Sequence, residues 1–136
     1  MKVLQPKSGN PCFGCGNDNP FGLKLTFQGD PQAGTAWTEF EPPTFLSGSA
    51  GIMHGGFISL LLDEVSSKVL SMLDKRGLTR TLEVSFEKIV PLGKQIRLEA
   101  RLLEQDGRKH IIEAKLLNSE GEILATSRAL FLVLGS

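Results

Sequence analysis

The sequence predicts a single α+β domain in which an antiparallel sheet curls around one long helix. Only one stretch, about 56–76, carries apolar residues at helical spacing, while several shorter stretches alternate apolar and polar residues. Turn-forming residues separate these alternating stretches, as expected for a meander. One helix and six predicted strands can bury their apolar faces together only if the sheet packs around the helix.

Two strands are predicted before the helix. Alternation over 23–27 indicates the first, and the glycine-rich stretch 29–34 reads as a turn. The second alternating stretch, 36–40, is the expected antiparallel partner, and Pro42 and Pro43 end it. The inward-facing residues are Leu23, Leu25 and Phe27 on the first strand, and Ala36, Thr38 and Phe40 on the second.

The helix is predicted from about Gly56 to Arg76. Lys75 and Arg76 fall in its last turn, where the helix dipole favours cations, and Gly77 fits the position just after the helix. Its apolar arc, spaced at 100° per residue, contains Phe57, Ile58, Leu61, Leu62, Val65, Val69, Met72 and Leu73.

Four strands are predicted after the helix. Asp106-Gly107 indicates a tight hairpin between the second and third of them, and 118–121 indicates another before the last. The alternating or apolar stretches that predict these strands are 82–86, 96–102, 112–116 and 129–134.

Composition limits the classes of function. The 136 residues suit one domain, with 1–21 as an irregular lead-in and 22–136 as the folded unit. Equal numbers of acidic and basic residues, 15 of each, give no reason to expect binding to nucleic acid or to a membrane. No secretory signal or membrane-spanning run is recognisable, and the two cysteines are too few for a disulfide scaffold, so we expect a cytoplasmic protein.

The segment His54-Gly55-Gly56 stands where the helix begins. Glycines are poor helix formers, but the first turn of a helix offers free backbone N–H groups and a partial positive charge. Without Cβ atoms, a ligand oxygen can approach those donors closely. An acid about two turns further along could then act on the bound group, which suits acyl chemistry. A glycine-rich loop that merely leads into a core helix is the alternative.

Two neighbouring acids lie on this helix. Asp63 falls roughly opposite the apolar arc, where an aspartate is ordinarily just solvated, but the small residues Ser59 and Ser67 beside it leave room for a ligand. Glu64 lies four residues before Lys68, which is the favourable order for an ion pair on a helix surface. Glu64 is therefore predicted to be structural.

Metal and redox chemistry are not predicted. His54 could be a base, a ligand or a positioning residue, and His110 is the only other histidine. These two with Cys12 and Cys15 could hold zinc by number, but their spacing matches no metal motif. The Cys-x-x-Cys pair neither follows a predicted strand nor opens a helix, so a packed turn is expected rather than a redox site.

Several segments together resemble one family. They are Gly51–Gly56 with Leu60–Glu64, Cys12–Gly16 with Asn19-Pro20 and Gly22-Leu23, and Thr79–Phe86 with Pro91–Gly93. These features resemble the hotdog-fold acyl-CoA thioesterases, and most closely the phenylacetic-acid-degradation type.

The resemblance implies roles for four residues. It implies that Asp63 is the general base or nucleophile, that the N–H of Gly55 polarises the thioester carbonyl, and that His54 positions the substrate. Thr79 would hold the water and would be supplied by the other subunit of a homodimer or dimer of dimers. Gly56, Ser59 and Ser67 are expected to line the substrate site. Some members carry an amide side chain where this chain has Gly48.

The predicted function is therefore hydrolysis of an acyl- or aryl-CoA thioester without a metal or cofactor. A helix-end N–H and a carboxylate can supply the oxyanion donor and the base that this reaction needs. A hotdog protein that only binds acyl-CoA or acyl carrier groups is the alternative from another class, and a dehydratase of the same fold is a third.

Overall fold

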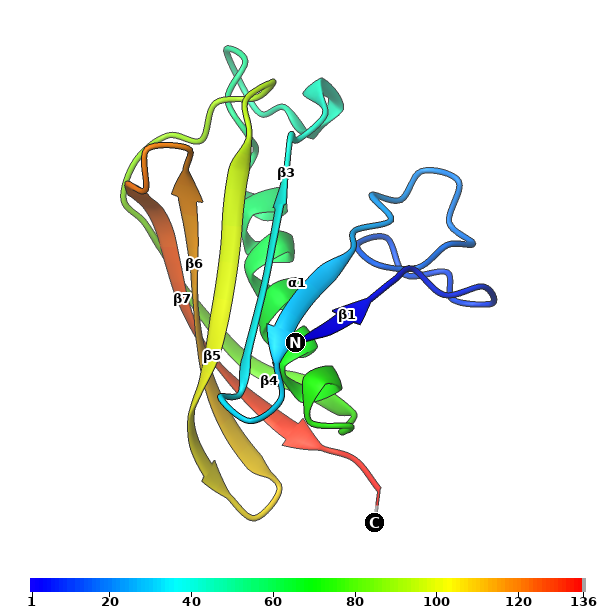
Figure 1. Cartoon of the computed structure of the whole chain (residues 1–136). Coiled ribbons are helices and arrows are strands. Elements are labelled where there is room, and N and C mark those ends of the chain that lie inside the picture. The colour runs from blue at the N-terminus through cyan, green and yellow to red at the C-terminus, as the bar shows by residue number, and fades with distance from the viewer. Residues whose placement is uncertain (136) are drawn as a thin grey trace.

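A computed structural model describes residues 1–135, which form one antiparallel sheet and one long helix (Figure 1). The sheet has seven strands in the order β1-β2-β3-β5-β6-β7-β4, so β1 and β4 are its edges. The elements are β1 (Lys2–Leu4), β2 (Phe27–Asp30), β3 (Thr35–Phe40), the short 3-10 helix η1 (Thr44–Leu46), α1 (Gly55–Met72), β4 (Gly77–Phe86), β5 (Ile96–Asp106), β6 (Lys109–Asn118) and β7 (Ile123–Val133).

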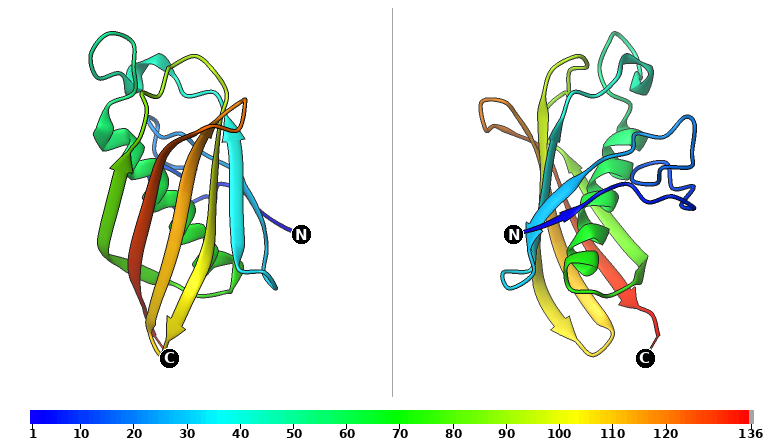
Figure 2. Two further views of the ribbon diagram at one scale, coloured as in Figure 1. Left: turned by 90° about the vertical axis from the view of Figure 1, so that its left-hand side faces the viewer. Right: turned by 45° about the vertical axis from the view of Figure 1, so that its right-hand side comes forward.

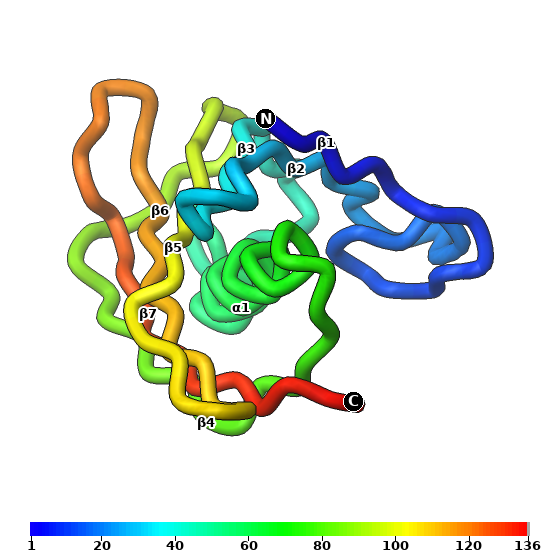
Figure 3. The backbone as a smooth tube through the Cα atoms, turned by 60° about the horizontal axis from the view of Figure 1, so that its bottom comes forward, coloured from blue at the N-terminus to red at the C-terminus, as the bar shows by residue number. Residues whose placement is uncertain are grey.

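The sheet curves around α1, as the view along the helix shows (Figure 3). The helix lies against one face of the sheet, and the opposite face carries no other element of this chain among the described residues (Figure 2). Buried residues of α1 such as Leu61, Leu62 and Val69 pack in one core with residues of the strands, including Phe27 and Phe131. The predicted hotdog fold is thereby confirmed.

The end of α1 differs from the prediction. The helix stops at Met72, and Asp74, rather than a glycine, adopts the left-handed conformation with φ 57°. Two hydrogen bonds complete a Schellman motif: Lys75 N donates to Leu70 O at 2.9 Å, and Asp74 N donates to Ser71 O at 3.1 Å. Gly77 instead begins β4, where a Cβ would lie 2.6 Å from Leu70 Cδ1.

The first predicted strand was also misplaced. Residues 23–26 are not in a strand, and β2 begins only at Phe27, so that 29 and 30 belong to the strand and not to the turn. Leu23 N and Leu25 N donate to the carbonyl oxygens of Phe13 and Gly14 instead, which ties this stretch to the lead-in. The lead-in itself contains β1, a short edge strand that the sequence did not predict.

The other predicted elements are confirmed. The hairpin at Asp106-Gly107 joins β5 to β6, with Gly107 at φ +59°, and the turn at 118–121 joins β6 to β7. Within residues 1–135, no helix is long and apolar enough to cross a membrane.

Candidate active site

His54 caps the N-terminus of α1. Its backbone is extended, with φ −63° and ψ 136°, and its Nδ1 accepts a hydrogen bond of 2.9 Å from Gly56 N. The N–H of Gly56 is therefore already used. Gly55 N–H, by contrast, makes no hydrogen bond within the described residues 1–135, as expected for the first residue of a helix. Of the two glycines, only Gly55 presents a free donor.

An apolar groove adjoins this free donor. Its volume is about 450 Å³, and it lies between the start of α1 and the end of β4. The exposed side chains of Phe86 and Ile89 lie at this groove although they are 30 or more residues from the glycine segment along the chain, so no local pattern could predict the contact. The groove is lined by Ile52, Met53, Gly55, Ile58, Phe86, Glu87, Lys88, Ile89 and Val90.

Asp63 and Thr79 form the polar pair of the site. Thr79, on β4, donates a hydrogen bond of 2.5 Å from Oγ1 to Asp63 Oδ1 of the same chain. The pairing of β4 with β7 shifts register between Thr79 and Thr81, which marks a β-bulge at this point. The expectation that Thr79 reaches Asp63 from another subunit is wrong, because β4 follows α1 directly and lies beside it (Figure 1).

The surroundings of Asp63 alter its protonation. Burial raises the pKa of this carboxyl above the usual aspartate value, the hydrogen bond from Thr79 opposes the rise, and the charge of Glu64 adds to it. A carboxylate with a raised pKa is a stronger base than a solvated aspartate. This position is therefore not an ordinary surface aspartate.

Ser59 and Ser67 flank Asp63 one turn away on either side. Both hydroxyls are turned back to the helix: Ser59 Oγ donates to Gly55 O at 3.1 Å, and Ser67 Oγ donates to Glu64 O at 2.8 Å. Both side chains are partly exposed. They leave space beside Asp63 without adding a free donor.

Asp63 and Gly55 are too far apart in one chain to act on the same carbonyl. They are eight residues apart on α1, and a rise of about 1.5 Å per residue separates them by roughly 12 Å. A base and an oxyanion donor must both lie within about 3 Å of the reacting group. The expectation that an acid two turns along acts on a group held at the same helix end is therefore wrong for a single chain.

Glu64 belongs to a different cluster from Asp63. Its predicted ion pair with Lys68 is present, with Nζ 3.4 Å from Oε1, but the side chains are only 13% and 15% exposed, so the pair is not on the surface. Cys12 Sγ lies 3.7 Å from Glu64 Oε2, and burial raises the pKa of the Cys15 thiol to about 12. The lead-in therefore covers Glu64 and leaves Asp63 uncovered.

The histidines are at opposite ends of α1. His110 is buried, with its Nε2 2.9 Å from Nζ of Lys75, which follows the helix. Burial lowers the pKa of His110. A four-ligand site with His54, Cys12 and Cys15 is thus ruled out by the fold.

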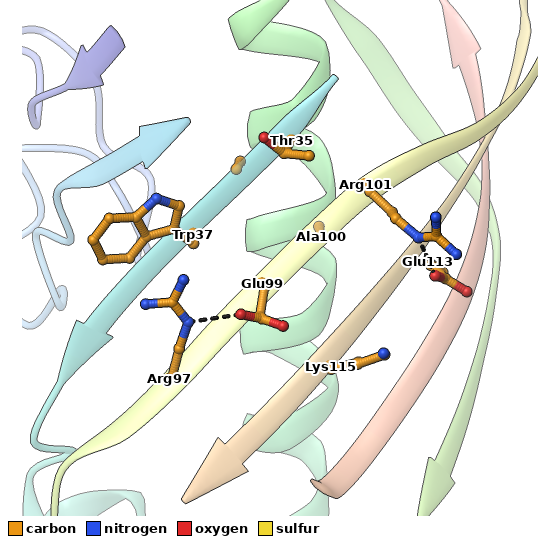
Figure 4. Close-up of a pocket in the computed structure, with 9 residues that line it drawn as sticks. Thr35, Trp37, Arg97, Glu99, Ala100, Arg101, Glu113 and Lys115 are labelled. Atoms are coloured by element: carbon orange, nitrogen blue, oxygen red, sulfur yellow. Dashed lines mark hydrogen bonds and ion pairs between the residues drawn. The ribbon is translucent and has the colours of Figure 1, made fainter. Parts of the chain in front are cut away.

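A pocket on the outer face of the sheet is a separate feature (Figure 4). Both of its arginines are ion-paired: Arg97 contacts Glu99 at 2.7 Å and Glu39 at 2.9 Å, and Arg101 contacts Glu113. It lies on β3, β5 and β6, on the other side of the sheet from α1 (Figure 4). It is not part of the candidate site.

Known proteins share this sequence pattern and fold. The sequence profile described as thioesterase superfamily matches residues 50–125, more than half of the chain. An acyl-coenzyme A thioesterase of Xenopus laevis, THEM4, is 27% identical over 96 residues, which cover 70% of this chain and 43% of that protein. The chain thus spans less than half the length of this relative.

Solved structures of thioesterases share the fold of this chain. The thioesterase superfamily protein RHA08564 superposes with a TM-score of 0.79 at 25% identity, covering 86% of this chain and 60% of that one. A hypothetical thioesterase of Streptococcus pneumoniae in complex with coenzyme A has a TM-score of 0.72 at 19% identity, over 75% and 82% of the two chains. A putative thioesterase of Ralstonia eutropha, titled phenylacetic acid degradation-related, has a TM-score of 0.72 at 22% identity, over 79% and 83%. The profile match over residues 50–125, on a hotdog fold, shows that the chain belongs to the thioesterase superfamily.

Proposed function

We propose that this protein hydrolyses acyl- or aryl-CoA thioesters, with Asp63 as general base or nucleophile. The observation that carries the proposal is the Asp63 carboxylate itself: it is held by Thr79, has a raised pKa, and lies beside two small serines on the helix. A protein that only binds acyl-CoA has no need of a carboxylate whose charge is disfavoured by burial.

The oxyanion donor in this proposal is the N–H of Gly55. It has no partner in the described chain and lies at the positive end of α1, next to the apolar groove. The groove is suited to an acyl or aryl group because its walls are mainly aliphatic and aromatic. His54 holds the first turn in shape through Gly56, so its role is positioning.

A complete site requires a second copy of the chain. Because about 12 Å separate Gly55 from Asp63, one copy supplies Gly55 and the groove, and the other supplies Asp63 and Thr79. A two-fold axis between antiparallel copies of α1 would form two such sites. The edge strand β4, whose Leu78 and Phe86 are 62% and 57% exposed, is the natural surface for this pairing.

The relatives support the substrate class. The frog relative is named an acyl-coenzyme A thioesterase, and the structure from Streptococcus pneumoniae contains coenzyme A. We also propose that the protein is cytoplasmic and that it belongs to the narrower phenylacetic-acid-degradation type.

The test is a thiol-release assay over short, medium, long and aryl acyl-CoAs. We expect turnover of at least one substrate class and loss of that turnover in Asp63→Asn. Tight binding without turnover across the whole set would show that the protein binds acyl-CoA without hydrolysing it. Sedimentation velocity at assay concentration tests the shared site, because an active monomer would contradict it.

A further inference from the structure

The lead-in and α1 bring three metal-ligand side chains together on the helix face next to Asp63. The thiols of Cys12 and Cys15 and the carboxylate of Glu64 all lie within 4.8 Å of one another. The catalytic proposal uses none of the three. They come from segments 49 residues apart, so the sequence spacing could not indicate them.

The local backbone is shaped for this approach. Gly16 N donates to Cys12 O at 3.0 Å, and Asn10 Oδ1 accepts from Cys12 N at 3.0 Å, which fixes the turn that carries both thiols. At Gly14 a Cβ would lie 2.9 Å from the Glu64 side chain, and at Gly16 it would lie 2.1 Å from Asn10 O. Gly16 thus lets the turn close on its own backbone, and Gly14 leaves room for the Glu64 side chain.

The carboxylate of Glu64 has few hydrogen-bond partners in its buried position. Its Oε1 is buried and makes no hydrogen bond within the described chain, and its contact with Lys68 is long at 3.4 Å. Its Oε2 faces Cys12 Sγ, a weak donor, at 3.7 Å. A buried carboxylate ordinarily has stronger partners, so this one is directed at a group that the chain itself does not supply.

We propose that Cys12, Cys15 and Glu64 bind one Zn²⁺ ion, with water in the fourth position. Two thiolates favour zinc over harder cations, and a Cys-x-x-Cys turn is a usual source of zinc ligands. Zn–S distances of about 2.3 Å and Zn–O distances of about 2.0–2.2 Å in a tetrahedron require an S···O separation near 3.5 Å. The separation of 3.7 Å between Cys12 Sγ and Glu64 Oε2 is close to that value.

The charges also balance. Binding releases the two thiol protons to solvent, so two thiolates and one carboxylate meet one divalent cation and the ammonium of Lys68, and the cluster is neutral. The positive charge of Lys68 thus balances the negative charge of the third ligand. The ion would fasten the lead-in to α1 beside Asp63 and would keep one coordination position open to solvent.

Cobalt substitution tests the site directly. The full chain, reduced and freed of metal with a chelator, is titrated with Co²⁺ and the thiolate-to-cobalt charge-transfer band is recorded. Because the chain has only two cysteines, such a band can come only from Cys12 and Cys15. We expect saturation at one equivalent, displacement by Zn²⁺, and a higher Tm with Zn²⁺ bound.

Three variants identify the ligands. Cys12→Ser and Cys15→Ser should each weaken the band, and Glu64→Gln should weaken binding by about 100-fold or more, since loss of outer-shell partners alone costs 10–100-fold. Glu104→Gln, an exposed acid on β5, is the matched control and should bind normally. If Glu64→Gln does not fold, the two serine variants still decide the question.

The outcomes separate this proposal from the catalytic one. Asp63→Asn should keep the cobalt band while losing turnover, and failure of the hydrolase assay would leave the metal result unaffected. A titration with no thiolate-to-cobalt band, or a Cys12–Cys15 disulfide that re-forms under reducing buffer, would overturn the zinc site. Unchanged metal affinity in Glu64→Gln would show that Glu64 is not a ligand of the ion.

Discussion

The hydroxyl of Thr79 donates a 2.5 Å hydrogen bond to the carboxylate of Asp63 within one chain. The two residues lie on consecutive elements, α1 and the edge strand β4, and a bulge in β4 adjoins the contact. The proposed acid and its positioning residue therefore belong to the same chain, and in the proposed mechanism the oxyanion donor comes from the partner copy.

Asp63→Asn tests the base. The substitution keeps the shape and the contact with Thr79 but removes the base, so kcat should fall by about 10²-fold or more. KM should change far less, because the loss is felt mainly in the transition state. Steady-state kinetics with the preferred acyl-CoA measures both constants. Glu104→Gln, on the exposed surface of β5, should match the unchanged chain; equal kcat for Asp63→Asn would mean that the wrong acid was assigned.

Thr79→Val tests the positioning residue. A hydrogen bond to a charged group contributes about 1.5–3 kcal/mol, so its loss should lower kcat by at least about tenfold. The bond from Thr79 lowers the pKa of Asp63, so its removal should move the acidic limb of the pH profile to higher pH. Thr79→Ser should restore both the rate and the profile. An unshifted profile in Thr79→Val would show that the contact has no part in tuning the base.

Gly55→Pro removes the proposed oxyanion donor and little else. Proline is accepted at the first position of a helix, and the extended backbone of His54 suits a residue before proline. Loss of one such donor should lower kcat by about 10²–10³-fold. Circular dichroism and Tm should remain close to those of the unchanged chain, which separates lost chemistry from lost fold.

Mixing two inactive variants tests which residues share a site. Asp63→Asn and Gly55→Pro subunits should complement each other, because a mixed dimer has one site with both groups intact, and random exchange should restore about a quarter of full activity. Asp63→Asn with Thr79→Val should not complement, since those residues act from the same chain. The opposite pattern would place Thr79 in trans after all.

Asp63→Asn should also change stability in a pH-dependent way. Burial raises the folded-state pKa of Asp63, so the folded chain holds this proton more tightly than the unfolded chain, whose value is about 3.9. The stabilisation from protonation is complete below the unfolded pKa and is lost as the pH rises through the folded pKa. At neutral pH the variant should therefore melt at a higher temperature, and the difference should narrow on acidification. A variant that is less stable at neutral pH would contradict the raised pKa.

Glu64→Gln should cost stability even without metal. The Glu64–Lys68 pair is mostly buried, so removing the carboxylate charge leaves the Lys68 ammonium without its acid, and we expect a loss of about 1–3 kcal/mol. Urea unfolding in the presence of a chelator measures it. The exposed pair Lys88–Glu122 is the comparison, since Glu122→Gln should change stability much less than Glu64→Gln.

The fold could be predicted where one local rule dominated. Alternation identified the later strands, and Asp106-Gly107 identified a hairpin, because each pattern is decided within a few residues. Leu23 and Leu25 also alternate, but their backbone N–H groups bond to the lead-in and not to a strand. The helix end was misjudged because Asp74 took the left-handed position that glycine usually occupies.

The sequence and its family resemblance suggested candidate site residues but not how they are arranged. The helical wheel put Asp63 on the polar face, and the resemblance gave it a role. Which chain supplies Thr79 depends on how β4 returns along α1, and the separation of Gly55 from Asp63 follows from helix rise. The contact between Cys12 and Glu64 is tertiary and has no sequence signature.

The exposed edge strand β4 also has a consequence for handling the protein. It carries unpaired backbone groups along one side, together with the exposed side chains of Leu78 and Phe86. Such an edge is a template for strand addition by any other chain. In the proposed dimer this edge is covered, so a substitution that breaks the dimer should expose β4 and make the chain aggregate faster than the unchanged chain at the same concentration.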